Sequence, residues 1–145
     1  MPKQKAVKLI EKYKTNDPFE LASYKKIQII TWNLHIEIKG FYKYLRRNKF
    51  IVLNSSLNEH LKRFVCSHEL GHAILHPREN TPFMRENTFF SIDRIEVEAN
   101  TFAVELLLPD NRLEEYKNTR LSLEEIAGIH GIPKEVARLK KCNLF

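Results

Sequence analysis

Apolar side chains recur at helical spacing near the start of the chain and predict two short helices there. Residues 3–14 form the first, because its apolar positions lie three or four residues apart: Ala6, Leu9, Ile10 and Tyr13. Asp17, Pro18 and Glu20 stand in the order of an N-cap, a first-turn proline and a third-position acid. A second helix is therefore expected to begin there and to end at about Tyr24.

The pattern then changes to short runs of β-branched and aromatic residues. These runs are Ile27 to Ile30, Ile36 to Ile38, Phe41 to Leu45 and Phe50 to Leu53. Asn33, Gly40 and Asn48 punctuate them, which predicts a small antiparallel meander. Strands this short bury their apolar face only by packing on a helix.

Helical spacing returns in the second half of the chain. Ser56 and Glu59 have capping-box spacing, so a helix over residues 55–76 is predicted, and Pro77 would end it. A loop is expected at 77–92, a further helix at 93–108, and a helical hairpin at 121–141. With 1–54 as N-terminal helices and sheet, residues 1–145 are interpreted as a single α+β domain.

Composition narrows the class of protein. No apolar run approaches the roughly 20 residues of a membrane-spanning helix, and no signal-peptide pattern is visible, so a cytoplasmic protein is expected. Cys66 and Cys142 are expected to be reduced. The net charge of +6 arises in residues 1–50, which hold most of the uncompensated Lys and Arg. This bias indicates a solvated surface first, and attraction to acidic partners or nucleic acid second.

The segment His68-Glu69-Leu70-Gly71-His72 carries the candidate chemistry. Two histidines four residues apart on a helix project from one face, so both imidazoles can bind one zinc ion. Glu69 lies beside that ion and can take a proton from the attacking water. Gly71 indicates that another segment or a ligand approaches the helix closely.

Other residues of this helix were weighed against these roles. His76 lies about 12 Å beyond His68 along a straight helix, too far to share its ion. It is interpreted as a helix C-terminal cation or as support behind a ligand. A Cys66–His68 nucleophile pair is disfavoured because residues two apart point in different directions.

Three motifs together resemble the ImmA/IrrE metallopeptidases of bacteria, phages and conjugative elements. They are Lys-Tyr-x-Thr-x-Asp-Pro-Phe-Glu-Leu at 12–21, His-Glu-Leu-Gly-His-Ala-Ile-Leu-His at 68–76, and Glu-Val-Glu-Ala-Asn-x-Phe-Ala with Leu-Leu-Leu-Pro at 96–109. The resemblance implies a gluzincin-like metallopeptidase core and cleavage of a helix-turn-helix repressor, which relieves transcriptional repression.

The third zinc ligand is expected to be Glu96. It shares a helix face with Ala99, Asn100 and Ala103, whose small side chains would let the zinc helix approach, and the family's Glu-x-x-Ala pattern agrees. Asn100 could then hydrogen-bond a ligand histidine. Two alternatives stay open: Glu98 binds the zinc, or Glu96 only caps its helix behind Asp93.

The expected function is therefore a zinc endopeptidase with one Zn²⁺ per chain, His68, His72 and Glu96 as ligands, and Glu69 as general base. The alternative is a non-catalytic zinc-binding module that sequesters a repressor or antirepressor. No sequence-specific DNA binding is expected, because the tail resembles a helix-turn-helix only weakly and carries Glu124, Glu125 and Glu135. Possible oxyanion donors are Tyr42, Tyr44 and His130.

Overall fold

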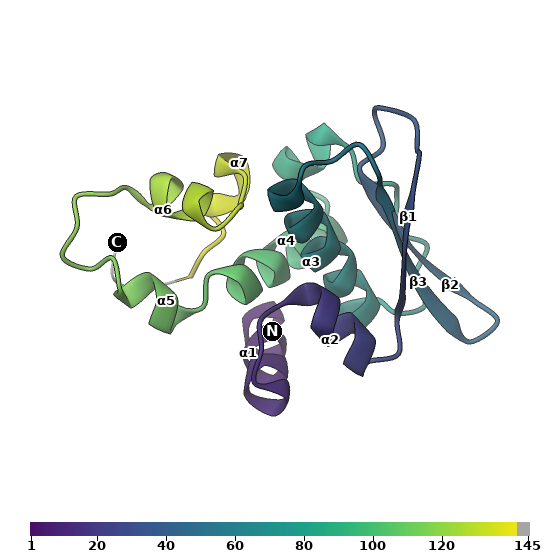
Figure 1. Ribbon diagram of the computed structural model, residues 1–145, viewed down its shortest axis with the longest axis horizontal. Coiled ribbons are helices and arrows are strands. Elements are labelled where there is room, and N and C mark those ends of the chain that lie inside the picture. Colours follow the sequence, from purple (N-terminus) through teal and green to yellow (C-terminus); the bar gives the residue numbers. More distant parts are fainter. Residues whose placement is uncertain (142–145) are drawn as a thin grey trace.

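A computed structural model describes residues 1–141 and has the expected α+β architecture (Figure 1). Its elements follow in the order α1 (Pro2–Tyr13), α2 (Pro18–Tyr24), β1 (Gln28–Trp32), β2 (Gly40–Leu45), β3 (Asn48–Asn54), α3 (Glu59–Leu75), the 3-10 helix η1 (Glu86–Phe90), α4 (Arg94–Leu107), α5 (Asp110–Glu114), α6 (Leu123–Ile129) and α7 (Lys134–Ala137). Cys142 lies outside the described residues.

The sheet is mixed rather than an antiparallel meander. Its strand order is β1-β3-β2, with β1 parallel and β2 antiparallel to β3. The run at Ile36 forms no strand, and Ile36 is 85% exposed. Residues 33–39 instead form a connection between β1 and β2, which lie on opposite sides of β3. Asn54 Nδ2 holds this connection by donating to the carbonyls of Leu34, His35 and Ile38. The predicted meander was wrong because this connection depends on a residue that comes later in the sequence.

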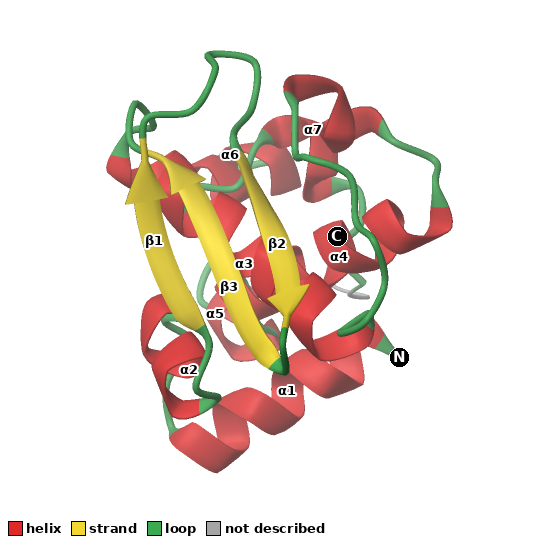
Figure 2. Ribbon diagram, turned by 90° about the vertical axis from the view of Figure 1, so that its right-hand side faces the viewer, coloured by secondary structure: helices red, strands yellow, loops and turns green. Residues whose placement is uncertain are grey.

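Helix α3 forms the centre of the molecule, with the sheet on one side and α4 on another (Figure 2). Every residue from Phe64 to Ala73 is buried, so this stretch is enclosed all round. Gly40 and Gly71 are the points of close approach. A Cβ on Gly40 would lie 2.8 Å from Val65 Cγ1, and one on Gly71 would lie 3.1 Å from Phe102 Cδ1. The close approach predicted from Gly71 is confirmed.

The start of α3 differs from the predicted capping box. Asn58 is the N-cap, and its side chain accepts a hydrogen bond from the backbone N–H of Leu61 at 2.8 Å. Ser56 is unavailable because its N–H and its hydroxyl both donate to Asn54 Oδ1. The Asp17 N-cap forms as the sequence predicts, and Asp93 is the N-cap of α4.

The segment 77–92 was expected to be a plain loop, but it contains η1 and is anchored to the core. Met84 is fully buried and forms a bridge with Gly40 of β2, and Phe89 packs edge-on against Phe64 with ring centroids 5.8 Å apart. This segment therefore holds a fixed position beside α3 and α4. Within residues 1–141 no helix is long and apolar enough to cross a membrane.

Candidate metal centre

His68, Glu69 and His72 project from the buried middle of α3 as a compact group. One potential ligand atom from each, a ring nitrogen or a carboxylate oxygen, lies within 4.8 Å of the others. All three residues are completely buried. The four-residue spacing of the histidines along one helix is sufficient to bring their rings together, with centroids 4.7 Å apart.

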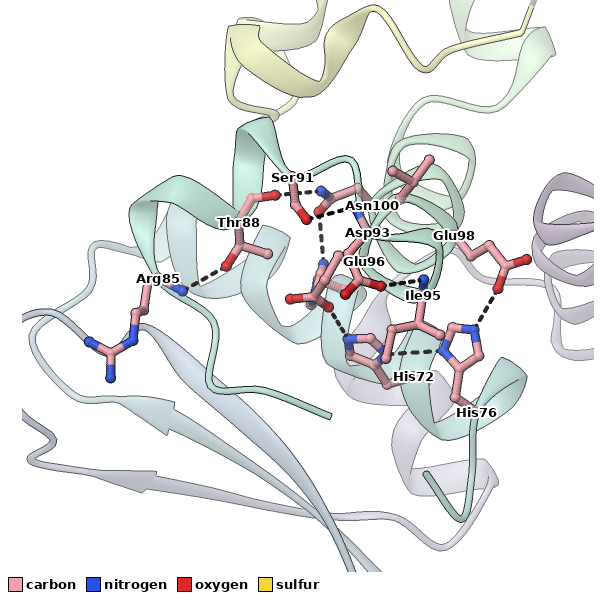
Figure 3. A network of polar contacts seen from close by, with 12 residues as sticks. His72, His76, Arg85, Thr88, Ser91, Asp93, Ile95, Glu96, Glu98 and Asn100 are labelled. Atoms are coloured by element: carbon pink, nitrogen blue, oxygen red, sulfur yellow. Dashed lines mark hydrogen bonds and ion pairs between the residues drawn. The ribbon is translucent and has the colours of Figure 1, made fainter. Parts of the chain in front are cut away.

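Glu96 reaches this group from the first turn of α4. Its Oε1 lies 2.7 Å from His72 Nε2 and 3.4 Å from His68 Nε2. Glu96 does not cap its own helix, because the Asp93 N–H, from which a third-position acid would accept a hydrogen bond, donates instead to Ser91 Oγ at 3.1 Å. Glu98, the alternative, points away from the group and accepts a hydrogen bond from His76 Nε2 at 2.7 Å (Figure 3). Of the two carboxylates, only that of Glu96 contacts His68 and His72.

Asn100 determines which nitrogen of His68 carries a hydrogen. Asn100 Nδ2 donates to the carbonyl of Thr88 at 3.0 Å, so its Oδ1 faces His68 Nδ1 at 2.8 Å and accepts from it. The predicted contact between Asn100 and a histidine is confirmed. The opposite nitrogen, Nε2, is buried and has no hydrogen-bond partner. The sequence could not indicate the role of the Thr88 carbonyl, because every residue has a backbone carbonyl.

His76 plays the same part for His72. Because the Glu98 carboxylate accepts from His76 Nε2, a neutral His76 has an acceptor at Nδ1. His72 Nδ1 lies 3.1 Å away and donates to it. A neutral His72 then presents the lone pair of Nε2 to Glu96, as Figure 3 allows the reader to follow. Of the two interpretations of His76, these contacts agree with the one in which it supports another histidine from behind.

The ionisation of these groups indicates a need for positive charge between them. Burial lowers the pKa of His72 to about 4. Burial also opposes ionisation of Glu96, but the closeness of the His68 and His72 rings, whose Nε2 atoms lie 3.4 and 2.7 Å from its Oε1, outweighs this and lowers its pKa to about 2. An ionised carboxylate and a bare ring nitrogen at hydrogen-bonding distance repel each other unless a cation lies between them.

Glu69 is the second buried group without a partner. Both of its carboxylate oxygens lack a hydrogen bond, and burial raises its pKa to about 8. Unpaired buried carboxyls are costly, whereas a cation beside Glu69 would stabilise its ionised form. The unpartnered His68 Nε2, the unpaired Glu69 and the imidazole–carboxylate donor set all fit a divalent metal ion.

The other candidate groups lie elsewhere. Burial raises the pKa of the Cys66 thiol well above its usual range, which removes it as a nucleophile. The Tyr42 hydroxyl donates to the Pro77 carbonyl at 2.5 Å. His130 contacts Tyr116 and lines a cavity together with His60 and Arg63. His68, Glu69 and His72 do not line that cavity. These contacts disfavour Tyr42 and His130 as oxyanion donors, and nothing in the contacts favours Tyr44.

Comparison with known proteins agrees with this geometry. The family described as the IrrE N-terminal-like domain, peptidase M78, matches residues 22–140. The chain belongs to this family. The ImmA/IrrE resemblance is thereby confirmed, and with it a zincin-like metallopeptidase fold.

Two relatives of this IrrE-like chain are informative. It is 65% identical over 133 residues to an "Uncharacterized immunity region protein 2" of Bacillus phage phi105, a match that covers 92% of this chain and 84% of the relative. It is 30% identical over 140 residues to "Metallopeptidase ImmA" of Bacillus subtilis (strain 168), covering 95% and 82%. The family and these relatives support a metallopeptidase of the phage immunity-region type.

Proposed function

We propose that this protein is a zinc-dependent endopeptidase that cuts a helix-turn-helix repressor and thereby relieves repression. The observation that carries the proposal is the convergence of Nε2 of His68, Nε2 of His72 and Oε1 of Glu96, with both separations from Glu96 at 3.4 Å or less. Asn100 and His76 hold the opposite ring nitrogens, so three donor atoms are aimed at one point.

This donor set suits zinc in a catalytic rather than a structural site. Structural zinc commonly has four protein ligands, often cysteines, whereas catalytic zinc has three and an open position. The one cysteine of residues 1–141, Cys66, is buried and lies outside the cluster. A binding module would also have no use for the unpaired carboxyl of Glu69, which destabilises the fold.

Glu69 is the proposed general base. A zinc ion bound at His68, His72 and Glu96 supplies Lewis acidity, which polarises the scissile carbonyl and acidifies water. The unpartnered oxygens of Glu69 take the proton from the attacking water and then deliver it to the nitrogen of the leaving amine.

The substrate is proposed to enter beside Glu96. A cavity of about 820 Å³ opens there between η1 and the start of α4, and Glu96 contributes to its wall. Phe83, Phe90 and Ile92 line it, and the last two are 59% and 95% exposed. Exposed apolar side chains beside a reactive centre suit an extended segment with apolar residues. The phage phi105 relative is named as an immunity-region protein, and this name supports a repressor as the protein that supplies the segment.

The test is to incubate the zinc-loaded protein with a helix-turn-helix repressor, which the family resemblance implies is encoded beside its gene. A limited set of cuts is expected, and a chelator should abolish them. Glu69→Gln should keep its zinc yet cleave about 10²–10⁴-fold more slowly, because it cannot accept the proton. Wild-type cleavage by Glu69→Gln, or unselective digestion of casein, would contradict the proposal.

Paired variants test the metal ligands in the same experiment. Glu96→Ala should lose both zinc affinity and cleavage, whereas Glu98→Ala should still bind zinc, only more weakly, because Glu98 acts through His76 and does not contact His68 or His72. Zinc affinity is measured by competition with a chelating dye. If Glu98→Ala loses zinc and Glu96→Ala keeps it, the ligand assignment fails.

A further inference from the structure

One end of the sheet carries a group of cations to which the proposed peptidase chemistry assigns no role. We define the basic end as Lys25, Lys26, Lys43, Arg46, Arg47 and Lys49. Lys25 and Lys26 lie between α2 and β1, whereas the other four lie on β2, on β3 and in the turn between them. The register brings these segments together, because Gln28 and Lys43 both pair with Phe50 of β3. Figure 2 shows the end of α2 and the β2–β3 turn at the same end of the sheet.

The charges of the basic end are uncompensated. None of its six side chains takes part in an ion pair within residues 1–141, and all but Lys49 are exposed. Residues 21–58 contain a single acid, Glu37, which lies in the connection at the opposite end of the strands and pairs with Arg85 at 3.2 Å. Lys25 and Arg78 are close enough to Lys49 to contribute to lowering its pKa, after the larger effect of burial.

The backbone gives a second, independent observation. Lys26, Arg46 and Arg47 have positive φ angles of 58°, 51° and 65°. Such angles are unfavourable for a residue that has a side chain, and a two-residue hairpin turn with both φ positive favours Asn-Gly. At three positions where glycine or asparagine would be more stable, the chain thus has a cation. The presence of cations at positions where they are unfavourable for the backbone indicates that their charge has a function.

We propose that the basic end binds the phosphate backbone of double-stranded DNA without reading its sequence. Cations projecting from separate turns suit phosphate contacts, which need charge and little else. A protein partner would favour an apolar centre, yet the only exposed large apolar side chains next in sequence to these six cations are Tyr24 and Leu45. This inference goes beyond the proposed function, since binding needs neither zinc nor a substrate. If the substrate is a repressor on its operator, such binding would hold the peptidase close to it.

The experiment measures fluorescence anisotropy of a labelled duplex of unrelated sequence, about two helical turns long, titrated with the zinc-loaded protein between about 50 and 200 mM salt. The wild type should bind, with an affinity that falls as salt rises. Arg46→Asn/Arg47→Gly removes two cations and supplies the residues that the turn favours. It should unfold at a higher temperature than wild type, bind roughly tenfold more weakly, and reduce the slope of log affinity against log salt by about 2.

The matched control is Lys117→Gln/Arg120→Gln, which removes the same charge from exposed positions after α5. Its affinity should stay within about twofold of wild type, because overall charge alone acts weakly at a distance. Three results would each overturn the proposal. They are no duplex binding at low salt, equal losses in both double variants, or binding of poly-glutamate without binding of the duplex, which would indicate an acidic protein instead. Because cleavage is not measured, failure here leaves the peptidase proposal untouched.

Discussion

Residues in the centre of this protein hold each other in defined protonation states. Asn100 is oriented by the Thr88 carbonyl and in turn orients His68, while Glu98 orients His76 and thereby His72. His68 and His72 thus each present Nε2 toward Glu96. Such supporting contacts commonly affect metal affinity nearly as much as the ligands do. Glu69 differs, because its oxygens have no hydrogen-bond partner.

Glu69 should therefore destabilise the metal-free protein in a pH-dependent way. Burial raises its pKa from 4.5 to about 8, so folding favours the protonated form. The contribution of Glu69 to stability is greatest below pH 4.5, falls as pH rises to about 8, and is then level. Glu69→Gln should abolish this fall and stabilise the metal-free protein at pH 8 by about 1–3 kcal/mol. Urea unfolding of both proteins across this pH range measures it. A variant less stable than wild type at pH 8 would contradict the burial argument.

At the scale of elements, the contact between α3 and α4 places Glu96 beside the histidines. The two helices approach most closely at Gly71, where an added Cβ would lie 3.2 Å from the carbonyl oxygen of Ala99 and 3.1 Å from Phe102 Cδ1. Both neighbours belong to α4, and Phe102 is fully buried. The position of Glu96 relative to His68 and His72 therefore depends on a glycine of the facing helix.

Gly71→Ala should weaken metal binding although alanine is the better helix former. The gain of about 0.5–1 kcal/mol in helix propensity is opposed by overpacking of about 1–3 kcal/mol, and relief of the contact would move α4 with Glu96. Gly128→Ala is the matched control, since nothing lies within 4 Å of an added Cβ there. It should stabilise the protein and leave zinc affinity unchanged. Calorimetric zinc titration and thermal unfolding compare the two; equal zinc affinity in both would refute the coupling.

At the scale of the whole molecule, a buried ion pair ties the end of the described chain to the core. Lys140 Nζ lies 2.6 Å from Glu105 Oε1, and both side chains are 1% exposed. Lys140 also contacts Asp110, which in turn pairs with Lys3 of α1. The first helix, α4 and the segment after α7 therefore meet in one network.

Breaking one side of this pair should cost much more than removing both. Lys140→Met leaves the Glu105 charge buried without its partner and should lower the free energy of unfolding by about 3–5 kcal/mol. Lys140→Met/Glu105→Leu should recover most of that loss, because two apolar side chains replace two charges. Urea denaturation measures both. If the double variant is no more stable than the single one, the pair is not the source of the effect.

The amino-acid sequence by itself determined the features that depend on short separations. The caps at Asp17 and Asp93, the helical placement of His68, Glu69 and His72, and the need for close approach at Gly71 follow from positions a few residues apart along the chain. Such interactions recur wherever the local sequence recurs. The family was also evident from three motifs, and its metal chemistry with it. The ligand roles of His68, His72 and Glu96 stay predictions until zinc is measured.

Only the tertiary structure decided the features that depend on residues far apart. Strand order follows from Asn54 binding the connection that precedes β2, and the cap of α3 passes to Asn58 because Asn54 engages Ser56. Glu96 and Glu98 are near neighbours with the same chemistry, and the rotation of α4 on α3 turns one toward His72 and the other toward His76. A helix has the same local energy at any rotation about its axis, so packing between helices alone selects the face it buries.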